Sequence, residues 1–99
     1  AARQLAERML SDGGRTPEER ITYAFRRATA RTPSAAELAA VLRGLERYRQ
    51  VYAADKAAAE QFVRHGDSPV PTGRDLAELA AYTATAGVIL NLDETITQE

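Results

Sequence analysis

The most apolar long stretch of the chain is residues 76–96, LAELAAYTATAGVILNLDETI, and it decides the fold. Near its end Val88, Ile89 and Leu90 are consecutive, so their side chains point in different directions and need more than one neighbouring element to cover them. We therefore expect a central helix here, followed by a turn at Asn91 and one short final helical turn. Its main apolar stripe has near-helical spacing: Leu76, Leu79, Ala80, Thr83, Ala86 and Leu90.

A recurring capping pattern marks where the helices begin. Four segments begin with a capping residue and carry glutamate three positions later, as in a capping box. They agree with four apolar stripes, so we expect an all-α fold, a compact bundle of four to five helices in a single domain. The segments are TPEE at 16–19, SAAE at 34–37, DLAE at 75–78 and NLDE at 91–94.

Glycine and proline punctuate the chain between these helices. Ser11-Asp12-Gly13-Gly14 ends a first short helix that carries Leu5, Met9 and Leu10 on one face. Pro33 ends the second helix by disfavouring the α conformation at Thr32. Residues 66–74 hold two prolines and two glycines, which predicts a loop after a C-cap at Gly66.

The third helix is expected from residue 35 to about residue 54. Beyond it the pattern leaves two alternatives over residues 35–65: Asp55 caps a further short helix over 56–65, or the long helix continues through the alanines. Tyr48 and Tyr52 continue the apolar stripe, which favours packing in the core or at a domain interface over a ligand-stacking platform. The predicted core is Ile21, Phe25, Leu38, Val41, Leu42, Leu45, Phe62, Leu79, Ile89 and Leu90.

Composition limits the function classes. The chain has 99 residues, enough for one domain, and its net charge of −1 gives no global attraction to nucleic acid or anionic lipid. It has no cysteine, which excludes disulfides, thiolate metal sites and cysteine-attached haem from it. No segment is long and apolar enough to span a bilayer, and no signal peptide is visible. The sequence opens on a helical pattern without a cap, so we expect 1–99 to be a domain cut from a longer polypeptide.

No residue pattern predicts a catalytic centre. His65 is the only histidine and has no orienting carboxylate, and at a helix end it is favoured by the dipole alone. Two adjacent acidic pairs, Glu18 with Glu19 and Asp93 with Glu94, diverge by about 100° on a helix and suit capping. Asp67 and Asp75 lack the spacing of a calcium loop. We therefore assign no catalytic, cofactor-binding or metal-binding residue, and expect neither a cofactor nor a small-molecule ligand.

Charge is distributed unevenly. Residues 15–31 hold five arginines and two glutamates, whereas residues 75–99 hold five acidic residues and no basic one. We expect these segments to pair, with Glu78, Asp93 and Glu94 as the acidic partners, and we expect no nucleic-acid partner. The alternative is a polyanion-binding face formed by Arg20, Arg26, Arg27 and Arg31, with Tyr23 among them.

Two blocks resemble a known family. Residues 20–38, RITYAFRRATARTPSAAEL, are similar to its Arg-Ile-x-x-Ala-Phe…Arg-x-Pro-(Thr/Ser)-x-x-Glu-Leu block, and residues 88–97, VILNLDETIT, to its closing Leu-Asn-x-x-Glu block. The family is the planctomycete-type C-terminal domain of unknown function numbered 1553. One departure is Ala30, where the family often has glycine before the arginine.

The resemblance implies a C-terminal helical module of large secreted or periplasmic proteins, many with a cytochrome-c-like domain elsewhere. It transfers no catalytic or haem residue, because the family has no established activity and Cys-x-x-Cys-His is absent here. The matching residues then have structural roles, with Ile21 and Phe25 in the core and Asn91 and Glu94 as a cap.

The sequence and the resemblance together predict a non-catalytic structural or interaction module whose partners are other domains of the same parent chain. Such a module should expose an apolar patch, at Leu5, Met9 or the tyrosines. Two alternatives remain. One is a subdomain that completes an active site housed elsewhere, through Arg20 and Arg27 or the 66–74 loop. The other is the polyanion-binding domain.

Overall fold

Five helices make up the part of the chain that the structure describes. The computed structural model describes residues 2–64 and 75–97, with side chains as far as Leu92. The all-α prediction is confirmed, and residues 35–64 form two helices rather than one. The helices are α1 (Ala2–Asp12), α2 (Pro17–Thr29), α3 (Ala35–Ala54), α4 (Lys56–Arg64) and α5 (Leu76–Thr97).

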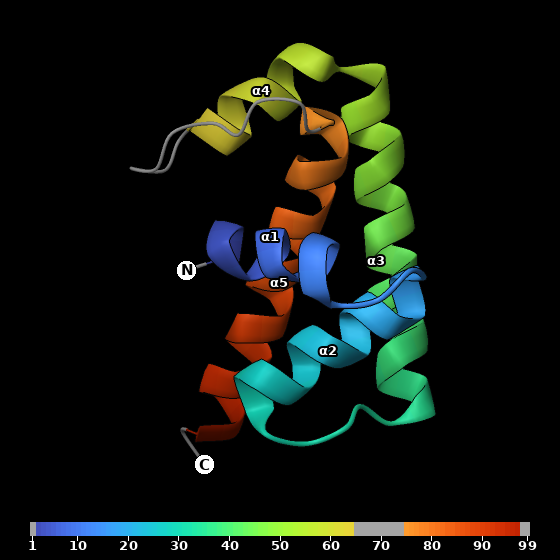
Figure 1. The fold of residues 1–99 in the computed structure, drawn as a ribbon, viewed down its shortest axis with the longest axis vertical. Helices are drawn as coiled ribbons and strands as arrows, with labels where there is room; N and C mark the ends of the chain where they lie inside the picture. Colours follow the sequence, from blue (N-terminus) through green and yellow to red (C-terminus); the bar gives the residue numbers. More distant parts are fainter. Residues whose placement is uncertain (1, 65–74, 98–99) are drawn as a thin grey trace.

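The last helix is the centre of the arrangement. α5 contacts each of the other four helices, as its apolar sequence predicts. Figure 1 shows α3 and α5 running in opposite directions along the long axis, with α1 and α2 crossing in front and α4 at one end. The molecule measures 37 × 25 × 23 Å. None of the described helices combines the length and apolar character that a bilayer crossing requires.

The core forms around consecutive residues of α5. Leu79, Ala80, Ala81 and Tyr82 are all fully buried, so this segment is covered on every side. α1 adds Ala6 and Met9, which are also fully buried. Of the predicted core residues, six are buried: Ile21, Phe25, Val41, Leu45, Leu79 and Ile89. Leu38, Leu42 and Leu90 are half-buried.

Phe62 is wrong as a predicted core residue, because its side chain is 40% exposed. Leu90 is half-buried but is not among the residues that form the core or pack against it. In α4 the fully buried pair is Ala59 and Val63, four residues apart, and this pair defines the inner face of the helix. Phe62 lies about 100° away from Val63 around the helix, at its edge, and stacks on Tyr52 with ring centroids 5.7 Å apart.

The predicted turn at Asn91 is also wrong, as is its role as a helix cap. α5 continues without a break to Thr97. An asparagine inside a helix costs about 0.7 kcal/mol relative to alanine, which is too little to end a helix that is packed on its neighbours. The apolar spacing also continues across Asn91, since Ile89 is buried and Leu92 packs against the core.

The other helix starts are confirmed with their caps. Thr16 accepts a hydrogen bond from the Glu19 backbone N–H at 3.1 Å, and the Thr16 backbone N–H donates to Glu19 at 3.1 Å. Ser34 and Glu37 form the same reciprocal pair. Asp55 and Asp75 accept from backbone N–H groups at the starts of α4 and α5. The predicted C-cap at Gly66 lies outside the described residues.

The corner between α2 and α3 involves Ala30 and Arg31 as well as Pro33. α2 ends at Thr29, and Ala30 takes a left-handed conformation with φ of 61°. Arg31 then forms a bidentate pair with Glu37, at 2.8 and 2.7 Å. Glu37 therefore caps α3 and also binds Arg31, the residue that follows the left-handed Ala30.

A polar cluster joins α2, α3 and α5 around Tyr82. The fully buried Tyr82 hydroxyl accepts hydrogen bonds from Arg20 at 3.2 Å and Arg49 at 3.4 Å. Both guanidinium groups also lie within 6 Å of the Tyr82 ring centre. Arg49 further binds Glu78 at 2.7 Å and Glu46 at 3.1 Å. The five side chains of this cluster connect the three helices.

A second long-range tie connects the first helix to the fourth. The Arg3 guanidinium donates a hydrogen bond of 2.8 Å to the carbonyl of Val63. α1 itself packs on α5 and α2. The α1–α2 turn is compact: a Cβ on Gly13 would lie 2.5 Å from the Met9 carbonyl oxygen, and Gly14 has φ of +111°.

Replacing Tyr82 with phenylalanine removes the shared acceptor of two arginines. We expect Tyr82→Phe to lower the free energy of unfolding by about 1–2 kcal/mol, the usual net cost of losing hydrogen bonds to charged groups. Urea denaturation measures this. Tyr48→Phe is the control, because the Tyr48 hydroxyl has no hydrogen-bond partner among the described residues; it should change stability by less than about 0.5 kcal/mol. Equal effects of the two substitutions would contradict the role of the Tyr82 hydroxyl.

Ala30→Gly should stabilise the domain. The left-handed conformation costs an L-residue about 1–2 kcal/mol, and glycine avoids it while adding about 0.4–1 kcal/mol of unfolded-chain entropy. We expect a net gain of about 0.5–1 kcal/mol by urea denaturation. The control Ala39→Gly, at an exposed position inside α3, should lose about as much. A lower free energy of unfolding in Ala30→Gly would show that the left-handed conformation of Ala30 is not strained.

Acid should weaken the α2–α3 corner. The hydrogen bonds from Arg31, followed by the backbone N–H of Ser34, lower the pKa of Glu37 to about 2. Because this folded pKa lies below the unfolded value of 4.5, the corner contributes its full stability above pH 4.5 and loses it as the pH falls towards 2. The carboxyl carbon of Glu37 should therefore titrate near pH 2 by NMR.

Urea denaturation across the same pH range gives a second measurement. Glu37→Gln should lose less stability than the wild type between pH 4.5 and 2. Glu18→Gln leaves the corner intact and should retain the steeper acid loss. A Glu37 midpoint near 4.5 would refute the effect of Arg31.

Candidate functional site

A hollow lies between the two long helices and is lined mainly by apolar groups. Its volume is about 260 Å³. α3 and α5 form its two walls because they run side by side, and no other described helix fills this part of the valley. The lining residues are Glu37, Ala40, Val41, Gly44 and Tyr48 of α3, with Thr85, Val88 and Leu92 of α5. We call this hollow the α3/α5 groove.

Gly44 gives the groove its depth. A Cβ at Gly44 would meet no atom within 4 Å, so the packing of the described residues does not require glycine there. Glycine inside a helix costs about 1 kcal/mol relative to alanine. Opposite, Val88 is 39% exposed although it stands in the most apolar helix. A bare stretch of α3 backbone therefore faces an uncovered apolar side chain of α5.

Further apolar surface continues along α3. Val51 lies seven residues after Gly44, on the same side of the helix, and is 52% exposed. The exposed apolar patch that we predicted from the sequence is therefore present, but its position differs. Met9 is fully buried and Leu5 packs against the core, so neither contributes in the way we predicted. Tyr48, which lines the groove, matches the predicted tyrosine contribution.

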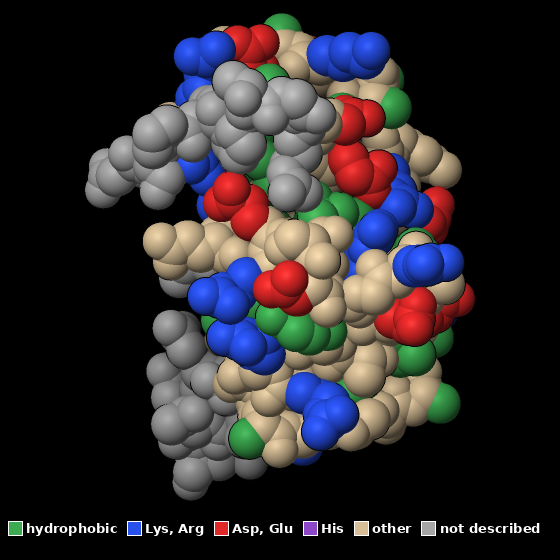
Figure 2. Space-filling view, in the orientation of Figure 1, with side chains coloured by type: hydrophobic (Ala, Val, Ile, Leu, Met, Phe, Trp, Pro, Cys, Tyr) green, Lys and Arg blue, Asp and Glu red, His purple; other side chains and the backbone are tan. Residues whose placement is uncertain are grey.

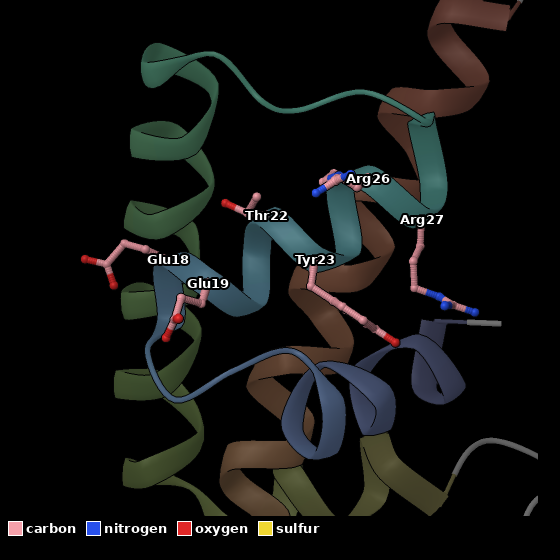
Figure 3. Close-up of a pocket in the computed structure, with 6 residues that line it drawn as sticks. All are labelled: Glu18, Glu19, Thr22, Tyr23, Arg26 and Arg27. Atoms are coloured by element: carbon pink, nitrogen blue, oxygen red, sulfur yellow. The ribbon is translucent and has the colours of Figure 1, made fainter.

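The arginine-rich helix α2 has a second, larger hollow of about 620 Å³ along its outer side. All six lining residues belong to α2 itself: Glu18, Glu19, Thr22, Tyr23, Arg26 and Arg27. Figure 3 shows that their side chains spread outwards, the glutamates at one end and Tyr23 and Arg27 towards α1. Arg27 stacks over Tyr23 with its guanidinium 5.5 Å from the ring centre. The groups do not converge on a common point, so this surface lacks the form of a catalytic or anion site.

The structure separates the four arginines of the predicted basic face. Arg20 binds Tyr82 and the carbonyl of Gly14, and Arg31 binds Glu37. Arg26 and Arg27 form no ion pair with any acidic side chain among the described residues. Figure 2 shows basic and acidic side chains interspersed over the face seen there.

The predicted pairing of these arginines with Glu78 is wrong, because Glu78 binds Arg49 of α3 instead. Arg49 and Glu78 face one another across the α3–α5 contact, nearer than any arginine of α2. The side chains of Asp93 and Glu94, the other predicted partners, lie outside the described residues.

The pKa shifts of Glu19 and Tyr52 have local structural causes. Hydrogen bonds from the backbone N–H groups of Thr16 and Arg15 lower the pKa of Glu19, as expected for a capping carboxylate. Burial, and then the neighbouring Tyr48, raises the pKa of Tyr52.

We also considered several acidic residues and His65 for metal binding or catalysis. Some of them have a capping role or project into solvent, and the others lie outside the described residues. Asp75 caps α5. Glu18 points away from the body of the molecule in Figure 3. His65, Asp67 and the 66–74 loop are outside the described residues. Within residues 2–64 and 75–92, no group of three histidine or acidic side chains is close enough to hold a metal ion.

Sequence reasoning missed Gly44 and Val88, the two residues that define the groove. Gly44 carried a usable signal, because a glycine inside a strong helical pattern, with no turn or cap to explain it, often has a packing reason. Val88 carried none, because its apolar character is the same as that of its buried neighbour Ile89.

Comparison with known proteins found no relative: no protein-family model matches the chain, and no curated protein or solved structure is significantly similar to it. The resemblance of residues 20–38 and 88–97 to the planctomycete-type C-terminal family therefore stays a prediction.

Proposed function

We propose that this domain is a non-catalytic interaction module that binds an amphipathic helix in the α3/α5 groove. The observation that carries the proposal is the bare backbone at Gly44, opposite the uncovered Val88. Both features lower the stability of the isolated domain, and both are explained if a third element covers them.

A helix is the occupant that fits this shape. Two helices running side by side leave a valley whose ridges accept side chains spaced three and four residues apart on a third helix. Ala40, Gly44 and Tyr48 mark two turns of α3, or about 12 Å of groove length. The small residues at positions 40 and 44 permit a close approach, which favours a partner face of small and medium apolar residues.

The wider context of this proposal comes from the resemblance alone. It places the partner helix in another domain of the same parent chain and the parent outside the cytoplasm. The groove supports an interaction role independently of that context.

Two other functions have less support. A polyanion-binding face would use Arg20, Arg26, Arg27 and Arg31, but two of these are engaged by Tyr82 and Glu37. An active-site subdomain acting through Arg20 and Arg27 would need converging polar groups, and Arg20 lies against Tyr82 while Arg27 stacks on Tyr23. Neither arrangement offers the uncovered apolar surface that the α3/α5 groove has.

The proposal is tested with a stapled helical peptide of about 14 residues, roughly 21 Å long, with alanine and leucine on one face and glutamine elsewhere. We expect binding that perturbs the amide NMR signals of Gly44, Val88 and Leu92. Gly44→Leu should abolish binding, because its side chain would occupy the groove.

Gly87→Leu is the matched control. Its Cβ also meets nothing within 4 Å, but Gly87 does not line the groove. Both substitutions should raise the free energy of unfolding, by about 0.5–1 kcal/mol, through better helix propensity. No binding to the wild type, or equal loss in both variants, would refute the proposal.

A further inference from the structure

We infer that the partner helix carries acidic residues along one edge, which meet Arg43 and Arg47 beside the groove. The inference rests on the proposed function and names the chemistry of its partner. It starts from the position of these two arginines relative to the bare backbone at Gly44.

Arg43 and Arg47 lie next to the groove residues Ala40 and Gly44 on α3, on the flank that is turned away from α5. Arg43 and Arg47 form one row along the helix, and Ala40 and Gly44 form the row beside it, because residues four apart lie one above the other. Both arginines are exposed, and with Leu42, Glu46 and Gln50 they line a separate shallow hollow of about 510 Å³. A helix resting on Gly44 would therefore have two cations along the edge that lies farther from α5.

No acidic side chain among the described residues pairs with either arginine. The two nearest carboxylates on α3 are already engaged, since Glu37 binds Arg31 and Glu46 binds Arg49. Arg49 shows the contrast, because it has Glu46 and Glu78 as partners. The positive charge on this flank of α3 is thus left without a counterpart in the described chain.

The opposite rim adds no charge of its own. Between Leu79 and Leu92, α5 contains no acidic or basic residue. The groove therefore has one basic edge and one neutral edge. A partner with acidic residues on a single edge would match this asymmetry and could bind in one direction only, because reversing the helix would move its acids to the neutral rim.

Exposed ion pairs add little affinity in water, but they steer encounter and exclude like-charged partners. The apolar contact at Gly44 supplies the close approach. The basic edge then discriminates between helices that share the same apolar face, which is the usual division between affinity and specificity at such interfaces.

Three versions of the stapled peptide test this. One keeps the neutral edge, one carries two glutamates four residues apart on that edge, and one carries two lysines there. At about 20 mM salt we expect the acidic peptide to bind roughly fivefold to tenfold more tightly than the neutral one, and the basic peptide more weakly. At about 0.5 M salt the three affinities should converge.

Variants of the domain show which arginines cause the preference for the acidic peptide. Arg43→Gln with Arg47→Gln should remove the preference for the acidic peptide and leave binding of the neutral peptide unchanged. Arg26→Gln with Arg27→Gln, on the outer side of α2, removes the same charge and should keep the preference.

The outcomes separate the two proposals. If all three peptides bind the wild type equally, or if the α2 variant loses the preference instead, the acidic partner is refuted and the groove function stands. If none of the peptides binds, the groove function itself is refuted.

Discussion

The structure depends on how one buried tyrosine hydroxyl is satisfied. Tyr82 lies in the middle of the most apolar helix, fully buried, where an unpaired hydroxyl would be costly. Arg20 from α2 and Arg49 from α3 reach it from different sides of the bundle, and Glu78 balances the charge of Arg49. The Tyr82 cluster therefore joins α2, α3 and α5 at one buried point.

The distribution of charge follows from the same arrangement. Arginines on the inner flanks of α2 and α3 hold helices together, whereas those on the outer flanks stand in solvent. Sequence position does not distinguish the two kinds: Arg47 and Arg49 are two residues apart in α3, yet Arg49 has three polar partners and Arg47 has none among the described residues. The difference is a rotation of about 200° around the helix, which turns one towards α5 and the other away from it.

The sequence predicted the helices better than it predicted their contacts. Capping boxes at Thr16 and Ser34 and the caps at Asp55 and Asp75 are local, so their residues alone determine them, and all four are present. Side-chain partners depend on the packing angles of whole helices, which is why Glu78 was predicted to bind α2 and instead binds α3. Phe62 and Asn91 were misjudged for a related reason. A phenylalanine is exposed when small neighbours already fill the inner face, and an asparagine stays helical when packing outweighs its low propensity.

The docking of α1 on α5 brings together the most distant elements of the described chain. Such contacts form late, because closing a long loop has to precede any gain from them. During synthesis, a chain that has emerged only through α4 lacks α5, on which α1 packs with Ala6 and Met9 fully buried in the finished fold. The first helix therefore remains an exposed apolar segment until the last helix leaves the ribosome. For that interval the nascent domain exposes apolar surface of the kind that chaperones recognise.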